Sequence, residues 1–413
     1  MDEFDALVRR THSHGLKVIL DFVPNHVSRD NVNFGQDDDR SVHWKAENDF
    51  YYYPGEQLSL PADFVSADSF DTPYMEFPAR ATGNNCFNSS PTVNDWFETV
   101  KLNYCDFHTA TWDKMLDILC FWAERGVDGF RCDMVELVPR EFLKWLISTM
   151  KSRYPSLQFI AEVYDRNGYR NCLNDAGFDC LYDKSGLYDI LHDIVRHNVH
   201  DSHMPMELWC STRRITGNWQ YLDDLQDGML NFLENHDEVR LCSDAFATKA
   251  SDSYAALAAS LLFNNASFLL YSGQEIGERG MDAEGYSGND CRSTIFDWWK
   301  SRSQAVLWNF SHGLSELDEE DKVTLDKYLS LTDSARQKTF SSGKTYDLCF
   351  CNVSSPGFDI DRHFAFLRYD DENCFLVVCN FSPRESRITV DIPIRGISRN
   401  VTVPAFDFTI EKL

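Results

Sequence analysis

The sequence lacks several features that would narrow its function at once. No apolar run approaches the roughly 18 residues that a membrane span needs, and no glycine-rich phosphate turn opens the chain. The 13 cysteines show neither Cys-x-x-Cys pairs nor Cys/His ligand spacing, so we expect no disulfide framework and no zinc site. We expect a reducing, cytoplasmic compartment.

Basic residues are also scarce. The chain has 39 Lys and Arg against 65 Asp and Glu, which gives a formal net charge of −26. Such a field repels phosphate backbones and anionic lipid, so we expect no nucleic acid partner and no membrane partner. A neutral substrate remains compatible with this charge. The 14% aromatic content would serve sugar stacking, although a buried core explains it as well.

What the chain does contain is a repeated helix-then-strand pattern. Residues 2–14 carry apolar side chains at helical spacing, and an apolar strand at 16–22 follows them. The alternation recurs with helices at 111–125 and 140–154 and strands at 127–132, 157–163, 178–181, 229–233 and 268–271. Repeated units of this kind predict a parallel sheet covered by helices, and their number favours a (β/α)8 barrel over an open doubly wound sheet.

Two regions depart from the barrel pattern. Residues 27–103 are rich in Asn, Asp, Ser, Pro, Gly and aromatics and are far longer than an ordinary loop, which predicts an inserted subdomain. Short alternating strands at 363–368, 374–381 and 387–392 predict a C-terminal β-sandwich over 341–413. The barrel would then consist of residues 1–26 and 104–340.

In such a barrel the reacting groups lie at the carboxyl ends of the strands. The polar residues that end the apolar runs are mostly carboxylates and histidines, in the segments DFVPNH (21–26), GFRCD (129–133), AE (161–162) and ENHD (234–237). Several acids on one rim would repel each other, so a function explains them better than a structural role. A pair of carboxyl groups that flanks a glycosidic bond is the catalytic arrangement of a glycosidase.

The segments DFVPNH, GFRCDMVE, FIAEVYD and FLENHD resemble, in this order, the four short conserved stretches of the α-amylase family, glycoside hydrolase family 13. The resemblance covers nearly the whole chain, because the insertion and the C-terminal sandwich also match that family's second and third domains. It implies a (β/α)8 TIM barrel with the inserted subdomain after strand three. The family's first two strands would lie upstream of residue 1, so we expect a truncated barrel.

The resemblance also implies roles for single residues. Asp133 would be the nucleophile, Glu162 the general acid/base and Asp237 the stabiliser of the transition state. Arg131 would pair with Asp133 and keep it ionised, while burial would raise the pKa of Glu162. His26 and His236 would bind sugar hydroxyls, and Asn25 would either support them in substrate binding or only fix its loop.

Two positions depart from the calcium-dependent members of the family. Lys101 falls where those members have an aspartate ligand, and Leu137 falls where they have a histidine. Lysine offers no lone pair to a hard cation. We therefore expect no cofactor and no calcium, with the Lys101 ammonium standing in for the metal's charge. Glu136 replaces a lysine on the leaving-group side, which leaves the acceptor subsites open.

The predicted function is retaining hydrolysis of α-glucosidic bonds, mainly α-1,4, in starch-like glucans or malto-oligosaccharides. The same residues serve transglycosylases and isomerases of the family, and the sequence does not separate these reactions. A third interpretation is an inactive, truncated remnant that only binds carbohydrate.

Overall fold

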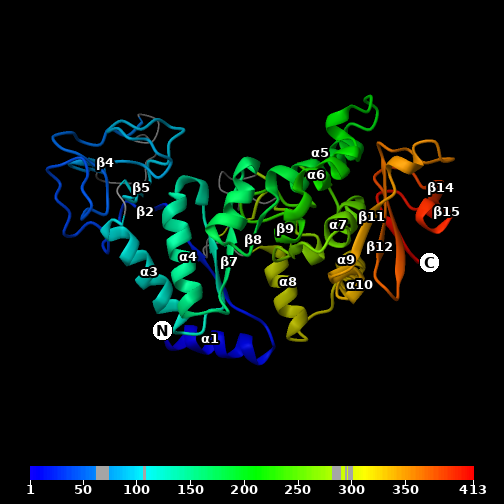
Figure 1. The fold of residues 1–413 in the computed structure, drawn as a ribbon, viewed down its shortest axis with the longest axis horizontal. Coiled ribbons are helices and arrows are strands. Elements are labelled where there is room, and N and C mark those ends of the chain that lie inside the picture. Colours follow the sequence, from blue (N-terminus) through cyan, green and yellow to red (C-terminus); the bar gives the residue numbers. More distant parts are fainter. Residues whose placement is uncertain (62–73, 106–107, 281–289, 294, 296–300) are drawn as a thin grey trace. The chain divides into compact units, whose positions relative to one another are not determined.

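The computed structural model describes residues 1–61, 74–105, 108–280, 290–293, 295 and 301–413. The chain forms two compact units, Met1–Leu181 and Tyr182–Leu413 (Figure 1). Among the described residues no helix is both long enough and apolar enough to cross a bilayer. All 13 cysteines are free thiols.

A parallel sheet forms the centre of the first unit. Its strands run in the order β1-β6-β7-β8, with bounds Ile19–Phe22, Gly129–Cys132, Gln158–Ala161 and Cys180–Tyr182. Each strand overlaps a segment that the apolar pattern predicted. Phe130, Cys132, Phe159 and Ala161 are almost fully buried, as expected for a sheet covered by helices.

Helices accompany these strands along the chain. They are α1 (Asp2–Ser13), α3 (Ala110–Ala123) and α4 (Arg140–Arg153). Figure 1 shows α3 and α4 side by side, and the Trp112 ring of α3 lies 5.3 Å from the Phe142 ring of α4. One face of each is buried because its apolar residues recur every three to four positions. The predicted helices of this unit are confirmed to within a few residues.

The predicted insertion contains short antiparallel pairs. Strand β2 (His26–Ser28) pairs with β5 (Thr99–Lys101), and β3 (Tyr52–Tyr53) pairs with β4 (Ala79–Arg80). The buried Glu76 carboxylate binds the guanidinium groups of Arg29 at 2.7 Å and Arg80 at 2.6 Å. Since isolated two-stranded ribbons are marginal in water, this ion-pair cluster supplies part of the cohesion.

The second unit also begins with parallel strands and helices. Strand β9 (Met229–Phe232) pairs in parallel with β10 (Ser267–Leu269). Its helices are α5 (Asp189–His200), α6 (Arg213–Leu222), α7 (Tyr254–Leu262), α8 (Arg302–Ser311), α9 (Glu319–Ala335) and α10 (Lys338–Ser341). Helix α7 is buried along almost its whole length, which fits its run of Ala and Leu.

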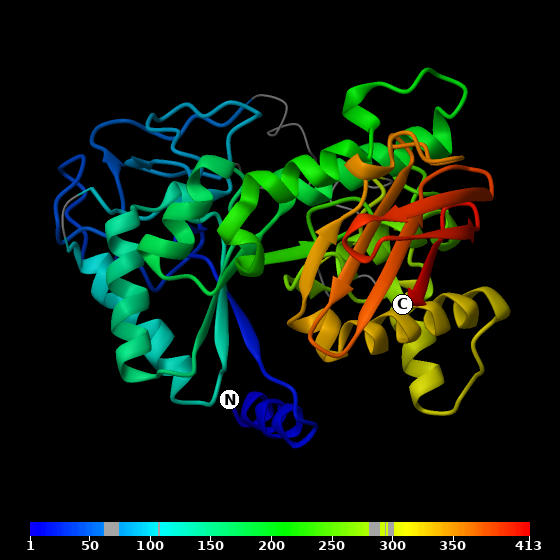
Figure 2. The same ribbon diagram turned by 45° about the vertical axis from the view of Figure 1, so that its right-hand side comes forward.

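The chain ends in antiparallel β structure, as predicted (Figure 2). One sheet has the order β11-β12-β13-β16, with bounds Lys344–Asp347, His363–Tyr369, Cys374–Asn380 and Phe408–Lys412. A second layer is the ribbon β14 (Ser386–Ile392) with β15 (Ile397–Val403). Alternate residues of β14 are buried, namely Ile388, Val390 and Ile392, so this ribbon turns one face to the core.

Short helical turns join the longer elements. The 3₁₀ turns are η1 (Val135–Leu137), η2 (Arg166–Gly168), η5 (Leu208–Cys210), η6 (Asp223–Gly228), η7 (Ala250–Asp252), η8 (Gln274–Ile276), η9 (Phe350–Asn352) and η10 (Pro393–Arg395). Two π-helical turns are η3 (Asn171–Ala176) and η4 (Lys184–Tyr188).

Parallel βα units, an insertion after β1 and a C-terminal β domain together confirm the expected fold class.

Gly129, at the start of β6, tests how tightly the first sheet is packed. A Cβ at this position would lie 2.4 Å from the Gln158 carbonyl oxygen and 2.7 Å from Ile19 Cδ1. We expect Gly129→Ala to lower the free energy of unfolding by about 1–3 kcal/mol through overpacking. Gly168→Ala is the control, because its Cβ would meet nothing closer than 3.6 Å. Equal thermal midpoints for the two variants would contradict this packing.

Candidate active site

The polar residues that follow β6 and β7 are placed by the register of the sheet. Asp21 pairs with Arg131 across β1 and β6, and Cys132 pairs with Ala161 across β6 and β7. The ladder of backbone hydrogen bonds continues past the strand ends. The Asp133 N–H donates to the Phe22 carbonyl at 2.9 Å, and the Glu162 N–H donates to the Cys132 carbonyl at 3.0 Å. Asp133 and Glu162 are therefore neighbours at the same edge of the sheet.

Arg131 joins the carboxylates of three adjacent strands. Its Nη1 lies 2.9 Å from Asp21 Oδ1 and 2.9 Å from Asp133 Oδ1, and its Nη2 lies 2.8 Å from Glu162 Oε1. The arginine is 7% exposed and Glu162 is 2% exposed. The planar guanidinium can bind several carboxylates because its donors point in fixed, diverging directions. The expected pairing of Arg131 with Asp133 is present.

Glu162 receives two further hydrogen bonds that the sequence did not reveal. The Met134 N–H donates to Oε2 at 2.9 Å, and the Tyr164 hydroxyl donates to Oε1 at 2.7 Å. Met134 presents its N–H from a left-handed conformation with φ 43°. Tyr164 could have been anticipated, because residues i and i+2 of an extended segment point to the same side.

Asp133 differs from the expectation that Arg131 keeps it ionised. The pKa of Asp133 is raised from 3.8 to about 7, mainly by burial and then by the charges of Glu162 and Asp21, although the charge of Arg131 lowers it. The desolvation of a carboxylate with 18% side-chain exposure, next to two like charges, outweighs one guanidinium. Without substrate, Asp133 thus holds its proton to a higher pH than an ordinary aspartate.

Asn25 directly precedes His26, the first residue of β2, and Lys101 links Asn25 to Leu137 at the end of η1. The Asn25 amide donates to the Gly83 carbonyl at 2.8 Å, and its Oδ1 accepts a hydrogen bond from Lys101 Nζ. The same ammonium donates to the Leu137 carbonyl at 2.6 Å. Burial lowers the pKa of Lys101 to about 8. Burial and then the charge of Lys101 lower the pKa of His26, which favours the neutral imidazole.

His236 and Asp237 belong to the second unit, in the turn that follows β9. Asn235 shapes this turn, because its Oδ1 accepts from the Asp237 N–H at 2.8 Å and from the Glu238 N–H at 2.9 Å. Glu234 is fully buried and paired with Arg240 at 2.6 Å. The His236 Nε2 lies 3.2 Å from Asp237 Oδ2. Asn235 and Glu234 thus anchor the segment that carries the two predicted residues.

The predicted site residues therefore fall into three groups. Arg131, Asp133 and Glu162 form one cluster, and Asn25 and His26 lie together in the same unit. His236 and Asp237 lie together in the second unit. The first cluster places two carboxyl groups, those of Asp133 and Glu162, around one buried guanidinium at adjacent strand ends.

A family model described as "Alpha amylase, catalytic domain" matches residues 1–316. The chain belongs to the α-amylase family. Neopullulanase 2 of Thermoactinomyces vulgaris is 24% identical over 318 residues, covering 76% of this chain and 46% of that protein. The α-1,4-glucan:maltose-1-phosphate maltosyltransferase of Rhodospirillum rubrum is 41% identical over 71 residues. These residues cover 17% of this chain and 10% of that protein.

Solved structures support the same α-amylase-family fold. The cyclic α-maltosyl-(1→6)-maltose hydrolase of Arthrobacter globiformis, in complex with maltose, superposes with a TM-score of 0.64 at 18% identity. The match covers 100% of this chain and 79% of that one. The chain spans about half the length of the curated relatives that it matches.

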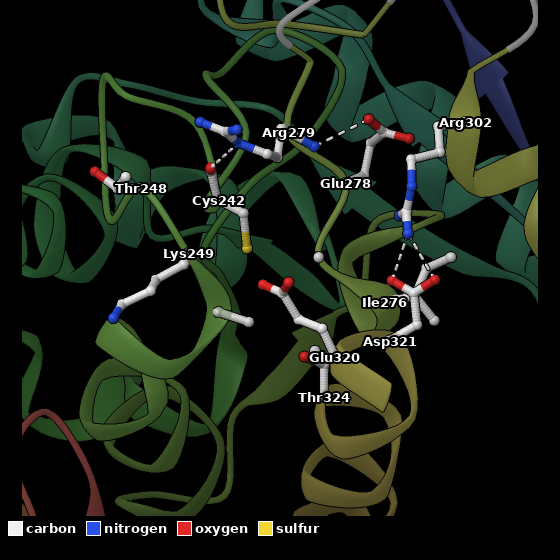
Figure 3. A pocket seen from close by; sticks show the side chains of 12 residues that line it. Cys242, Thr248, Lys249, Ile276, Glu278, Arg279, Arg302, Glu320, Asp321 and Thr324 are labelled. Atoms are coloured by element: carbon white, nitrogen blue, oxygen red, sulfur yellow. Dashed lines mark hydrogen bonds and ion pairs between the residues drawn. The ribbon is translucent and has the colours of Figure 1, made fainter. Parts of the chain in front are cut away.

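A cavity of about 310 Å³ lies elsewhere in the second unit of this α-amylase-family chain (Figure 3). Figure 3 shows Arg302 bound to Asp321 on one side, Lys249 on the other, and Glu320 between them. Its lining does not include His236 or Asp237. The strand-end residues, and not this cavity, therefore define the candidate active site.

The raised pKa of Asp133 has a consequence for stability. Well below pH 3.8 the side chain is neutral in both the folded and the unfolded chain, whereas from about pH 4 to about pH 7 folding must suppress its ionisation. We expect Asp133→Asn to stabilise the fold by about 1–3 kcal/mol at pH 8 and by almost nothing at pH 4. Thermal unfolding at both pH values measures this.

Asp117→Asn, an exposed substitution on α3, is the matched control and should leave the thermal midpoint nearly unchanged at both pH values. If Asp133→Asn instead destabilised the protein at pH 8, the carboxylate would be stabilising and the described cause of its pKa shift would be wrong.

Proposed function

We propose that the protein is a retaining glycoside hydrolase that cleaves α-glucosidic bonds, mainly α-1,4, in starch-like glucans or malto-oligosaccharides. The observation that carries this proposal is the cluster in which one buried arginine contacts both Asp133 and Glu162 at adjacent strand ends. Membership of the α-amylase family supports the substrate class. The structural relative that was solved with maltose supports the same class.

In the first step of the proposed reaction, an Asp133 oxygen attacks the anomeric carbon as the bond to the leaving oxygen breaks. Glu162 transfers its proton to that oxygen, and in the second step it takes a proton from the water that releases the sugar. The Tyr164 hydroxyl, 2.7 Å from Glu162 Oε1, can accept a hydrogen bond from the protonated acid and donate one to the carboxylate. It therefore suits both protonation states.

The remaining predicted residues would act on the sugar without bonding to it covalently. In this proposal Asp237 holds hydroxyl groups as the ring flattens, and the Asn235 turn keeps its carboxylate oriented. His26 and His236 donate hydrogen bonds to the sugar in the innermost subsite. Asn25, whose amide is fully buried and bonded to Gly83 and Lys101, acts by fixing His26.

Transfer of the glycosyl group to another sugar is the second candidate. The local similarity to a maltosyltransferase favours it, since that enzyme's name describes transfer. By the family resemblance, Glu136 would lie on the leaving-group side, where an acceptor would bind, and its carboxylate accepts a hydrogen bond from the Asp165 N–H. Hydrolysis and transfer differ only in whether water or a sugar reaches the covalent intermediate.

Substitution of the clustered carboxylates tests the hydrolase proposal. We expect Asp133→Ala to abolish reducing-sugar release from maltoheptaose, because no covalent intermediate can form. Glu162→Gln should lower kcat/KM by about 10²–10⁴-fold, the usual contribution of a general acid/base. Asp117→Asn is the control with unchanged activity. A wild-type chain that binds maltoheptaose but releases no sugar would support a carbohydrate-binding role instead.

The products of maltoheptaose distinguish hydrolysis from transfer. We expect shorter oligosaccharides whose new reducing ends are α-anomers when first formed, because two successive inversions retain the configuration. Proton NMR in the first minutes of reaction measures the anomer, and chromatography measures chain length. Products longer than the substrate would establish transfer, and β-anomers would exclude a covalent intermediate on Asp133.

A further inference from the structure

We infer that the Lys101 ammonium is a built-in replacement for a structural calcium ion, joining the His26 loop to the segment behind Asp133. The resemblance to calcium-dependent amylases implies a metal near Asn25. The residues of this chain do not fit one. This inference concerns the cation alone and does not depend on the proposed reaction.

The contacts of Lys101 show why a metal does not fit. Its Nζ donates to the Leu137 carbonyl at 2.6 Å and to Asn25 Oδ1, the two oxygens that face it. Lys101 is 4% exposed and Asn25 is 0% exposed. A calcium ion needs six to eight oxygen ligands, commonly including carboxylates. Within the described part of the chain, no carboxylate forms an ion pair with Lys101, so an added divalent cation would meet an uncompensated positive charge.

The three segments that the ammonium joins all lead to the candidate site. Asn25 precedes His26, and the Asn25 Nδ2 also lies 3.1 Å from the His26 Nδ1. Leu137 ends η1, the turn that begins after Met134, whose N–H binds Glu162. Lys101 itself ends β5 and pairs with His26 in the β2–β5 ladder. A cation at this junction therefore positions both the histidine loop and the turn behind the carboxylates.

Lysine at this junction has a simple physical advantage. Its charge is attached to the chain, so the link forms on folding and needs no free ion, whereas a metal stabilises the folded state only in proportion to its occupancy. A positive charge between two uncharged oxygens is also well hydrogen-bonded, which offsets part of the cost of its burial. Lys101 is thus a positioning residue, with no contact to the reacting bond.

The first arm of the test uses the wild-type chain. Its thermal midpoint should be the same in excess chelator and in millimolar calcium, because Lys101 already occupies the cation position. A calcium-specific rise in the midpoint that Asn25→Ala abolishes would overturn the inference. This arm needs no enzyme activity, so its outcome is separate from that of the hydrolase proposal.

The second arm rebuilds the metal site. Lys101→Met keeps the length of the side chain but removes the charge, and it should unfold several degrees below the wild type. Lys101→Asp should be equally weakened in chelator and should regain stability in calcium but not in potassium, since the new carboxylate joins the Asn25 and Leu137 oxygens. Lys144→Met, an exposed change on α4, is the control and should match the wild type.

Each result of the second arm decides the question. If neither variant is recovered folded in chelator and calcium rescues Lys101→Asp but not Lys101→Met, the inference stands. If Lys101→Met is as stable as Lys144→Met, the ammonium holds nothing together. If Lys101→Asp ignores calcium, the two oxygens do not form a cation position, and the inference fails.

Discussion

The buried guanidinium of Arg131 is the interaction on which the candidate site depends. Three carboxylates on adjacent strands would repel each other at one sheet edge, and a single cation with diverging donors holds them there. The strands must keep their register for this contact to form, because Asp133 and Glu162 are brought together by consecutive ladder hydrogen bonds. Correct packing of the sheet is therefore also what allows Arg131 to balance the charges of the site.

The same arrangement explains why the site is costly to the fold. Desolvation raises the pKa of Asp133 although an arginine touches it, so part of the folding energy is used to keep this carboxylate in place. Functional residues commonly reduce the stability of the fold, because a site with fewer clustered charges would be more stable. A bound sugar would change that balance by placing hydroxyl groups and a developing positive charge beside the acid.

The sequence predicted the elements well and the contacts between them poorly. Apolar runs located every described parallel strand to within about three residues, and the four motifs selected Asp133, Glu162 and the Asn25–His26 pair, because burial and strand ends leave clear patterns. The bridging of Arg131 to Glu162 and the Met134 N–H contact depend on backbone direction and register, which no local pattern encodes. The Tyr164 hydroxyl contact was missed although its i, i+2 spacing from Glu162 could have indicated it. The pKa of Asp133 was misjudged because the number of nearby acids and the extent of desolvation are properties of the folded chain.

Met134 holds Glu162 through its main chain, with a left-handed backbone. Because an amide N–H is present in every residue except proline, natural variation at this position would leave the contact intact as long as the backbone can follow. Asparagine, aspartate and glycine adopt this conformation most readily, whereas valine and isoleucine resist it. Relatives can therefore differ in the side chain at this position while a main-chain N–H still orients the glutamate, so alignment of side chains alone would overlook this contact.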